Sequence, residues 1–162
     1  FLYFIYEKQP QSKEYSMEKV GTILEKKGRT VTTISPQMIV YRALEQMSEK
    51  GIGALMVVNE QGKVEGIITE RDYARKVILQ GKSSKETYVG DIMTKELFVV
   101  HPSTSLEECM GLMTEKRIRH LPVMDGDKMV GIISIGDVLK AIIEAQGIMI
   151  EHLNKYIMGA YV

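Results

Sequence analysis

The sequence predicts a mixed α/β (α+β) protein made of two tandem repeats, each with the element order β-α-β-β-α. The first observation behind this is internal similarity at a nearly constant offset. Met47–Lys50 aligns with Met113–Lys116, 66 positions later, and Gly66–Thr69 aligns with Gly131–Ser134 at an offset of 65. The second observation is that both copies show the same succession of helical and strand patterns.

Within each repeat, a short strand precedes a proline, Pro36 or Pro102, which we expect in the first turn of the following helix. That helix carries apolar residues at helical spacing. Two β-rich runs then predict a hairpin, and a second helix should begin after Thr69 and after Ser134. The expected strands are 31–34 and 98–100, and the expected hairpins are 54–58 with 64–69 and 120–124 with 129–134.

The expected organisation is a tag or precursor remnant (1–16), an N-terminal helix and lead-in (17–30), repeat 1 (31–80), a linker (81–96), repeat 2 (97–146) and a C-terminal helical tail (147–162). A unit of about fifty residues can hardly bury its own apolar faces. The two repeats should therefore pack as a pseudo-two-fold pair, with clefts between them. The amphipathic tail should pack on its own domain or on a second copy of the chain.

Composition excludes several functional classes. Hydrophobic residues are 44% of the chain, and Lys+Arg equal Asp+Glu at 21 each, so there is no net field to hold nucleic acid or an anionic membrane. No apolar run reaches the length of a membrane span. A single cysteine, Cys109, excludes an internal disulfide and lies on an apolar helical face, which favours a core position. Three dispersed histidines (His101, His120 and His152) do not suggest a metal site.

No phosphate-binding glycine loop or activated nucleophile is evident, so we expect neither an enzyme nor a catalytic cofactor.

The doubled pattern of a proline-led helix, a β-hairpin and Gly-hydrophobic-hydrophobic-Ser/Thr-x-x-Asp resembles the CBS (cystathionine-β-synthase-type) repeat pair, or Bateman module. The segments 68–76, 89–94 and 117–123 are similar to small stand-alone CBS-pair proteins of bacteria and to plant mitochondrial CBS-pair thioredoxin regulators. The resemblance implies an adenosyl ligand (AMP, ADP, ATP, NAD(H) or S-adenosylmethionine) as a regulatory signal, and a homodimer. The expected location is cytoplasmic, with mitochondria as the alternative.

Two aspartates are the candidate ribose ligands. Asp72 and Asp137 occupy the same register of the two copies, and a carboxylate can accept hydrogen bonds from two adjacent ribose hydroxyls. Thr69 and Ser134 lie three residues earlier, at a helix start that favours phosphate. The alternative is that Ser/Thr-x-x-Asp only caps the helix.

Arg119 and His120 are the candidate phosphate contacts, by resemblance to the basic pair of the family. The alternatives are a solvated arginine and a hydrogen-bonded core histidine. The first repeat has Gly53-Ala54 at the matching positions, so the two clefts cannot be equivalent. Arg71 either reaches a phosphate or pairs with a nearby carboxylate.

Adenine should lie between apolar groups of both repeats. The resemblance implies one pocket with Gly53, Ala54, Arg119, Ser134 and Asp137, and a second with Thr69, Arg71, Asp72, Ile92 and Met93, while Leu121 and Pro122 are further adenine candidates. The predicted function is an energy or redox sensor. The alternative is a protein–protein regulatory scaffold with empty clefts.

Overall fold

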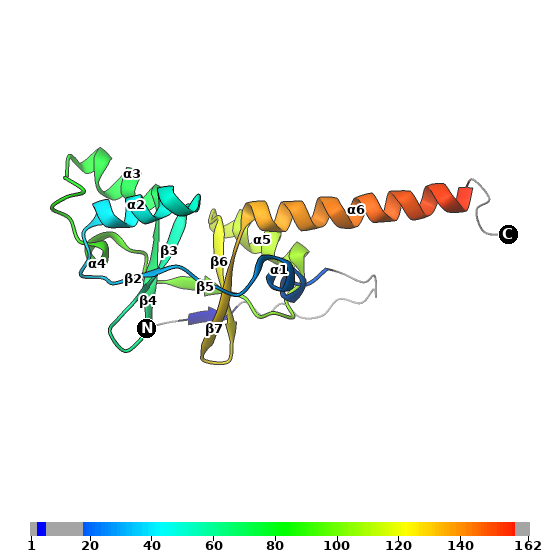
Figure 1. The fold of residues 1–162 in the computed structure, drawn as a ribbon, viewed down its shortest axis with the longest axis horizontal. Helices are drawn as coiled ribbons and strands as arrows, with labels where there is room; N and C mark the ends of the chain where they lie inside the picture. Colours follow the sequence, from blue (N-terminus) through cyan, green and yellow to red (C-terminus); the bar gives the residue numbers. More distant parts are fainter. Residues whose placement is uncertain (1–2, 6–17, 158–162) are drawn as a thin grey trace. The chain divides into compact units, whose positions relative to one another are not determined.

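The computed structural model describes residues 3–5 and 18–157 (Figure 1). It has mixed α and β structure, and the described residues form two compact units. Unit 1 holds residues 3–5 and 30–98, and unit 2 holds residues 18–29 and 99–157. The predicted fold class is therefore confirmed. Most of the segment predicted as a tag or precursor remnant, and the last five residues of the predicted tail, lie outside the described residues.

Unit 1 contains a three-stranded sheet with the order β2-β3-β4. Strand β2 runs parallel to β3, and β3 and β4 form an antiparallel hairpin. The bounds are β1 (Tyr3–Ile5), β2 (Thr33–Ile34), α2 (Val40–Lys50), β3 (Ala54–Val58), β4 (Val64–Thr69), α3 (Glu70–Lys76), the 3-10 helix η1 (Ile78–Gln80) and α4 (Val89–Ile92). Strand β1 pairs with β5 (Leu97–Val99), which lies at the boundary of the two units.

Unit 2 repeats this plan. Its elements are α1 (Val20–Lys27), α5 (Leu106–Lys116), β6 (His120–Asp125), β7 (Lys128–Ser134) and α6 (Ile135–Ile157). Strands β6 and β7 form an antiparallel hairpin, and Val100 adds a parallel bridge to Val123. The two predicted hairpins and the helices after Thr69 and Ser134 are thus confirmed.

The expected position of the prolines is wrong. Helices α2 and α5 begin at Val40 and Leu106, four residues after Pro36 and Pro102. Each proline instead lies in a turn, where its carbonyl oxygen accepts a hydrogen bond from a glycine N–H, at 2.9 Å from Gly90 and at 2.8 Å from Gly21. The chain turns at these prolines because another segment docks on their carbonyl groups.

Both α2 and α5 end at a left-handed residue, which lets the chain turn sharply into the hairpin. Gly51 has φ 62° after α2, and Arg117 has φ 54° at the matching position after α5. Arginine adopts this region at a steric cost that glycine avoids. The two repeats therefore share a backbone path even where their residue types differ.

Each unit has its own apolar core. In unit 1, Leu55, Val57 and Ile68 of the hairpin are fully buried against Ala43 and Met47 of α2. In unit 2, the corresponding buried residues include Leu112, Leu121, Ile133 and Val138. Cys109 is also fully buried on α5, which confirms the prediction that it lies in the core.

Each core is covered by a short helical segment, and the one that covers unit 2 is remote in sequence from the rest of that unit. Helix α1 precedes the first repeat but packs in unit 2, and α4 precedes the second repeat but packs in unit 1. The N–H of Val20 donates to Thr104 (3.0 Å), and the N–H of Val89 donates to Met38 (2.8 Å). Helices α1 and α4 are thus structurally equivalent. Each packs in the unit of the repeat that it does not directly precede.

A glycine in the second hairpin strand makes room for each covering segment. A Cβ added at Gly66 would meet the carbonyl oxygen of Thr94 at 2.7 Å and the Sδ of Met93 at 3.0 Å. At Gly131, the added atom would meet the flexible end of Leu24 at 2.5 Å. The backbone carbonyl cannot move without loss of the mutual hydrogen bonds between Ile67 and Thr94. Gly66 is therefore less tolerant of a larger side chain than Gly131.

We predict that Gly66→Ala destabilises the protein by about 1–3 kcal/mol, because its methyl group overlaps a backbone atom. The control is Gly111→Ala on α5, where nothing lies within 4 Å of an added Cβ. That change should stabilise the helix by about 0.5–1 kcal/mol. Urea unfolding monitored by circular dichroism measures both. Equal unfolding midpoints for the two variants would contradict the packing described here.

Candidate functional site

In unit 1, the Thr69-x-x-Asp72 motif forms a complete capping box at the start of α3. The N–H and the Oγ1–H of Thr69 both donate to Asp72 Oδ2, at 2.9 and 2.8 Å. The N–H of Asp72 donates back to Thr69 Oγ1 at 3.2 Å. Thr69 and Asp72 therefore do cap the start of α3, as the alternative interpretation of the motif predicts. This role does not decide whether the carboxylate also binds a ligand.

The other oxygen of Asp72 is also engaged. Its Oδ1 accepts from Lys76 Nζ at 2.7 Å and from Thr94 Oγ1 at 3.1 Å. The ammonium of Lys76 donates in addition to the carbonyl oxygen of Ile92 at 2.7 Å. Only 9% of the Asp72 side chain is exposed. A ligand at this carboxylate would have to replace bonds that the protein already makes.

Asp137 has a more open environment in the first turn of α6. Its Oδ2 accepts from the N–H of Ser134 at 2.8 Å and from Lys27 Nζ at 2.6 Å. The same ammonium donates to the carbonyl oxygen of Ile132 at 3.2 Å. The exposed fraction of the Asp137 side chain is 25%. The bonds with Lys27 and the Ser134 N–H both end on Oδ2.

The charge state of Asp137 follows from two opposing effects. Burial alone would raise the pKa of its carboxyl group, but hydrogen bonds from Lys27 and from the Ser134 N–H, together with the lysine charge, hold it below its ordinary value. Asp137 is therefore a carboxylate at neutral pH. A carboxylate accepts stronger hydrogen bonds from hydroxyl groups than a neutral acid does.

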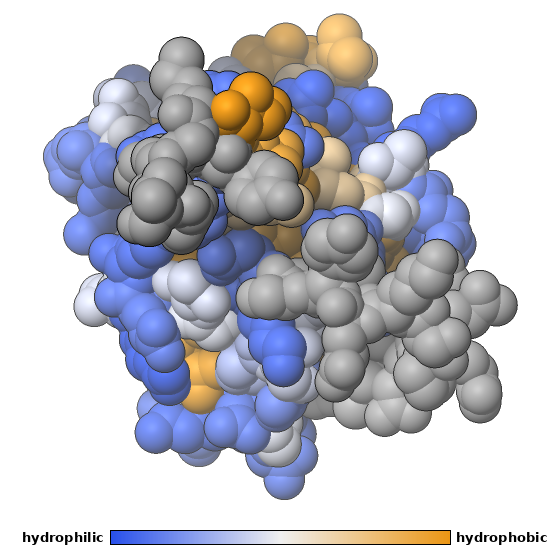
Figure 2. Space-filling model, turned by 90° about the vertical axis from the view of Figure 1, so that its right-hand side faces the viewer, coloured by the Kyte–Doolittle hydropathy of each residue, from blue (hydrophilic) through white to orange (hydrophobic). Residues whose placement is uncertain are grey.

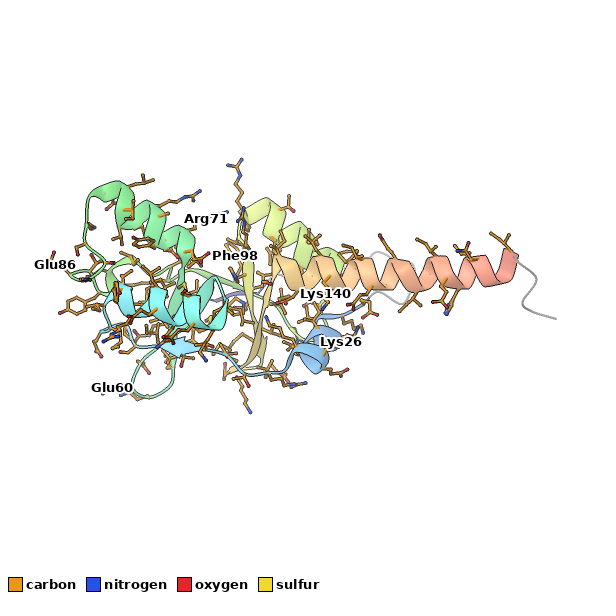
Figure 3. The ribbon with its side chains drawn as sticks, turned by 45° about the horizontal axis from the view of Figure 1, so that its top comes forward. Lys26, Glu60, Arg71, Glu86, Phe98 and Lys140 are labelled. Atoms are coloured by element: carbon orange, nitrogen blue, oxygen red, sulfur yellow. The ribbon has the colours of Figure 1, made fainter. Side chains whose placement is uncertain are left out.

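The remaining candidates of unit 1 lie around the start of α3. The carbonyl oxygen of Gly53 accepts from the N–H of Glu70 at 3.1 Å, and Ala54 pairs with Thr69 in the hairpin. Arg71 is half-buried on α3 (Figure 3). Ile92 is buried in α4 and Met93 follows it, partly buried against the core. The structure thus brings these residues together in unit 1.

The candidates of unit 2 form the matching cluster around the start of α6. The carbonyl oxygen of Arg119 accepts from the N–H of Ile135 at 2.9 Å, and His120 pairs with Ser134. Arg119 is exposed and His120 is half-buried, whereas Pro122 is buried further along the strand. Arg119, His120, Ser134 and Asp137 therefore share one end of the hairpin. The predicted combination of Gly53 and Ala54 with this cluster spans both units and stays a prediction.

Sequence reasoning missed the two lysines that hold the aspartates. Lys76 lies four residues after Asp72 on one helix, a spacing that indicates an ion pair. In the second repeat, Ala141 stands at that register, and Lys27 reaches Asp137 from α1 instead. The signal for Lys27 was the similarity of Val20-Gly21 to Val89-Gly90, whose offset of 69 differs from that of the repeats.

Metal-binding clusters and the single thiol can be assessed for the described part of the chain. Among these residues, no group of three or more His, Cys, Asp or Glu side chains could hold a metal ion. Burial raises the pKa of the Cys109 thiol to about 12, with smaller contributions from Glu108 and Glu107, so this thiol stays protonated at neutral pH. No described helix is both long and apolar enough to span a bilayer.

Comparison with known proteins agrees with this architecture. A family model described as "CBS domain" matches residues 22–78 and 89–144. The chain is 50% identical over 126 residues to "CBS domain-containing protein CBSX3, mitochondrial" of Arabidopsis thaliana, which covers 75% of this chain and 61% of that protein. The chain thus spans about three fifths of the length of the plant relative.

Two solved structures are also similar. A putative signal-transduction protein with CBS domains from Burkholderia ambifaria has a TM-score of 0.76 and 53% identity, over 80% of this chain and 96% of that one. A CBS domain pair in complex with 5'-methylthioadenosine and S-adenosyl-L-methionine has a TM-score of 0.69 and 26% identity, over 78% of this chain and 96% of that one.

We predict that Lys27→Met destabilises the protein at pH 7 by about 1 kcal/mol, because the ion pair with Asp137 is only partly buried. The pKa of Asp137 is lowered on folding. The contribution of the Asp137 carboxylate to stability is therefore fully present above about pH 4, the ordinary pKa of an aspartate, and it is lost as the pH falls through the lower pKa of the folded state. The difference between wild type and variant should therefore shrink at pH 3. Urea unfolding at both pH values measures it.

Lys26→Met is the matched control, since Lys26 makes an exposed pair with Glu144 at 3.3 Å. This control should change stability by less than about 0.5 kcal/mol at either pH. If the two lysine variants behaved alike, the Lys27–Asp137 contact would have no special weight.

Proposed function

The chain belongs to the CBS-domain family and carries two CBS domains, and we propose that it is a regulatory module that binds an adenine nucleotide rather than an enzyme. The observation that carries this proposal is Asp137. It is an ionised, partly exposed carboxylate at a helix start, next to the strand end that carries Arg119 and His120. This is a suitable arrangement for a ribose with attached phosphate.

The chemistry follows from the groups present. The two ribose hydroxyls would donate to Asp137, and the phosphate would lie near the N-terminus of α6, where the helix dipole favours negative charge. Arg119, His120 and Lys27 are the basic groups of this unit that would contact phosphate. Lys27 lies within 2.6 Å of the carboxylate, so its ammonium would compete with the ribose for Asp137 or turn to the phosphate.

The two repeats should differ in affinity. Asp72 has both oxygens bonded within its own unit, whereas the Asp137 bonds with Lys27 and the Ser134 N–H end on one oxygen. The first repeat also has Gly53-Ala54 in place of Arg119-His120. The remaining candidates, Ile92 and Met93, Gly53 and Ala54, and Pro122, would line the adenine. We propose that the site of Asp137 is the stronger one.

The ligand class is an adenosyl compound of the AMP, ATP or NAD(H) type, which would make the protein an energy or redox sensor. The solved CBS pair with 5'-methylthioadenosine and S-adenosyl-L-methionine supports this class. Regulation requires that the ligand bind two conformations with different affinity, since equal binding would shift nothing.

The second candidate function is a protein–protein regulator, for example of a thioredoxin-type partner. The similarity to the plant relative favours it, and it is compatible with ligand binding if occupancy changes the surface that a partner contacts. The name of that relative also supports mitochondria as the alternative to a cytoplasmic location.

We predict that isothermal titration with AMP, ATP, NAD+, NADH and S-adenosylmethionine detects saturable binding of at least one compound. Asp137→Ala should weaken that binding at least ten-fold, because the ribose loses its acceptor, and Asp72→Ala should weaken it less. Asp127→Ala, an exposed aspartate in the turn between β6 and β7, is the control and should bind normally.

A folded protein that binds none of these compounds would refute the sensor and favour the partner-binding scaffold. Equal loss in the Asp127 variant would show that the effect of Asp137→Ala is not local.

A further inference from the structure

Lys76 differs from an ordinary surface lysine. Hydrophilic residues cover much of the face that Figure 2 shows, and the charged end of a surface lysine normally lies in water. The ammonium of Lys76 instead donates to two acceptors of its own unit, Asp72 Oδ1 and the carbonyl oxygen of Ile92, each at 2.7 Å. The charged end of Lys76 is therefore fixed on the protein, although 39% of the side chain is exposed.

The fold holds the groups around this ammonium in place. Asp72 belongs to the capping box of α3, and Ile92 ends α4 and is buried in the core of unit 1. Thr94, whose hydroxyl donates to Asp72 Oδ1 at 3.1 Å, is bound to β4 by mutual backbone hydrogen bonds with Ile67 at 2.8 and 3.0 Å. The position that the ammonium fills is therefore preformed, and it would remain if the lysine moved away.

The hydrogen bonds of Asp72 leave no room for a further donor. A carboxylate has about four lone-pair sites, two on each oxygen. The N–H and the hydroxyl of Thr69 donate to Oδ2, and Lys76 and Thr94 donate to Oδ1. A ribose hydroxyl can therefore bond this carboxylate only when one of these donors leaves.

Lys76 is the donor that can leave at least cost to the fold. The Thr69 groups cap α3, and Thr94 is bound to β4 through its backbone. The lysine has the longest and most flexible side chain of the three, and its exposed part can turn into water. It also returns easily, because it follows Asp72 by four residues on one helix, the favourable order for an ion pair.

The second repeat is built differently at this point. Ala141 stands at the position of Lys76, and Asp137 is paired with Lys27 from α1. The second bond of Lys27, to the carbonyl oxygen of Ile132, is longer than that of Lys76, at 3.2 Å. A ligand therefore displaces the lysine of unit 2 more readily than the lysine of unit 1.

We propose that Lys76 closes the Asp72 site from within, so that the first repeat accepts an adenosyl ribose only after its ammonium leaves the carboxylate. The proposal rests on the proposed function and adds a regulatory element to it, since the Asp72 site becomes a latent second site. The apparent affinity of such a site is its intrinsic affinity reduced by the fraction of molecules in which it is open. Removal of the ammonium should therefore strengthen binding.

The test isolates the first repeat with Asp137→Ala, which disables the proposed stronger site, and uses adenosine as the probe. Adenosine has the ribose and the base but no phosphate, so loss of the lysine charge cannot weaken an attraction to phosphate. Isothermal titration compares Asp137→Ala with Asp137→Ala/Lys76→Met. We expect the double variant to bind adenosine about ten-fold more tightly or better, because its site is open. Adding Asp72→Ala should remove the gain.

Two further variants in the Asp137→Ala background serve as controls. Lys76→Arg keeps a cation beside Asp72 and should leave the site closed. Lys82→Met removes an exposed lysine from the linker of the same unit and should leave adenosine binding unchanged. Circular dichroism and the urea midpoint of each variant verify that the two units stay folded.

Amine reactivity tests the closed state in the wild-type protein, without a variant or a ligand. A lysine nitrogen that is bonded to two acceptors is less available to acetic anhydride than one in water. We expect Lys76 to be acetylated about ten-fold more slowly than Lys82, because it reacts from its open fraction. Mass spectrometry of the peptides measures both rates.

Equal acetylation rates at Lys76 and Lys82 would overturn the proposal, and so would unchanged adenosine affinity in a folded Asp137→Ala/Lys76→Met protein. Titration of the wild type with the nucleotides named above reports separately on the proposed function. Binding to the wild type without a gain in the double variant refutes the closure by Lys76 alone. Absence of binding in every variant refutes both.

Discussion

The fold of each unit depends on a covering segment that packs against the second strand of its hairpin. Gly66 and Gly131 leave space on the second hairpin strand, and the segments around Met93 and Leu24 fill it. For unit 2 this segment precedes the whole first repeat, so its core is completed only when the two distant parts of the chain meet. The hydrogen bonds of Val20 and Val89 with the turns after the two prolines fix both segments in place. The constraint explains why the prolines sit in turns rather than in helices.

The same covering segments also determine the charge near the candidate site. In unit 1, the ammonium of Lys76 donates both to the Ile92 carbonyl at the end of α4 and to Asp72, and the Thr94 hydroxyl donates to Asp72 directly. In unit 2, α1 contributes Lys27 itself. Burial alone would raise the pKa of Asp137, but hydrogen bonds from Lys27 and Ser134, together with the lysine charge, lower it. The two repeats thus pair their aspartates with lysines from different elements, and the side chains differ in exposed fraction, at 9% for Asp72 and 25% for Asp137.

Much of the fold could be predicted because it follows from local patterns. The hairpins at 54–69 and 120–134 and the helices after Thr69 and Ser134 are specified by alternation, turn residues and capping chemistry. The exchange of α1 and α4 could not be predicted from the repeat, since their mutual offset of 69 departs from the offset of 66 that aligns the helices α2 and α5. The candidate aspartates were found because their motif occurs twice in register. Lys27 was missed because its partner is 110 residues away in the sequence, and no local rule connects them.

Helix α6 connects the candidate site of unit 2 with an exposed C-terminal part. Its first turn holds Asp137, and its core-facing residue Val138 is fully buried in unit 2, while the residues from Gln146 to Asn154 are exposed. A stiff helix transmits a small rotation at its start to its far end, because its backbone hydrogen bonds resist bending. A ligand that displaces Lys27 from Asp137 would act on the packing of α1 against α6. By thermodynamic linkage, any effect of the ligand on this packing must equal the effect of the packing on ligand affinity.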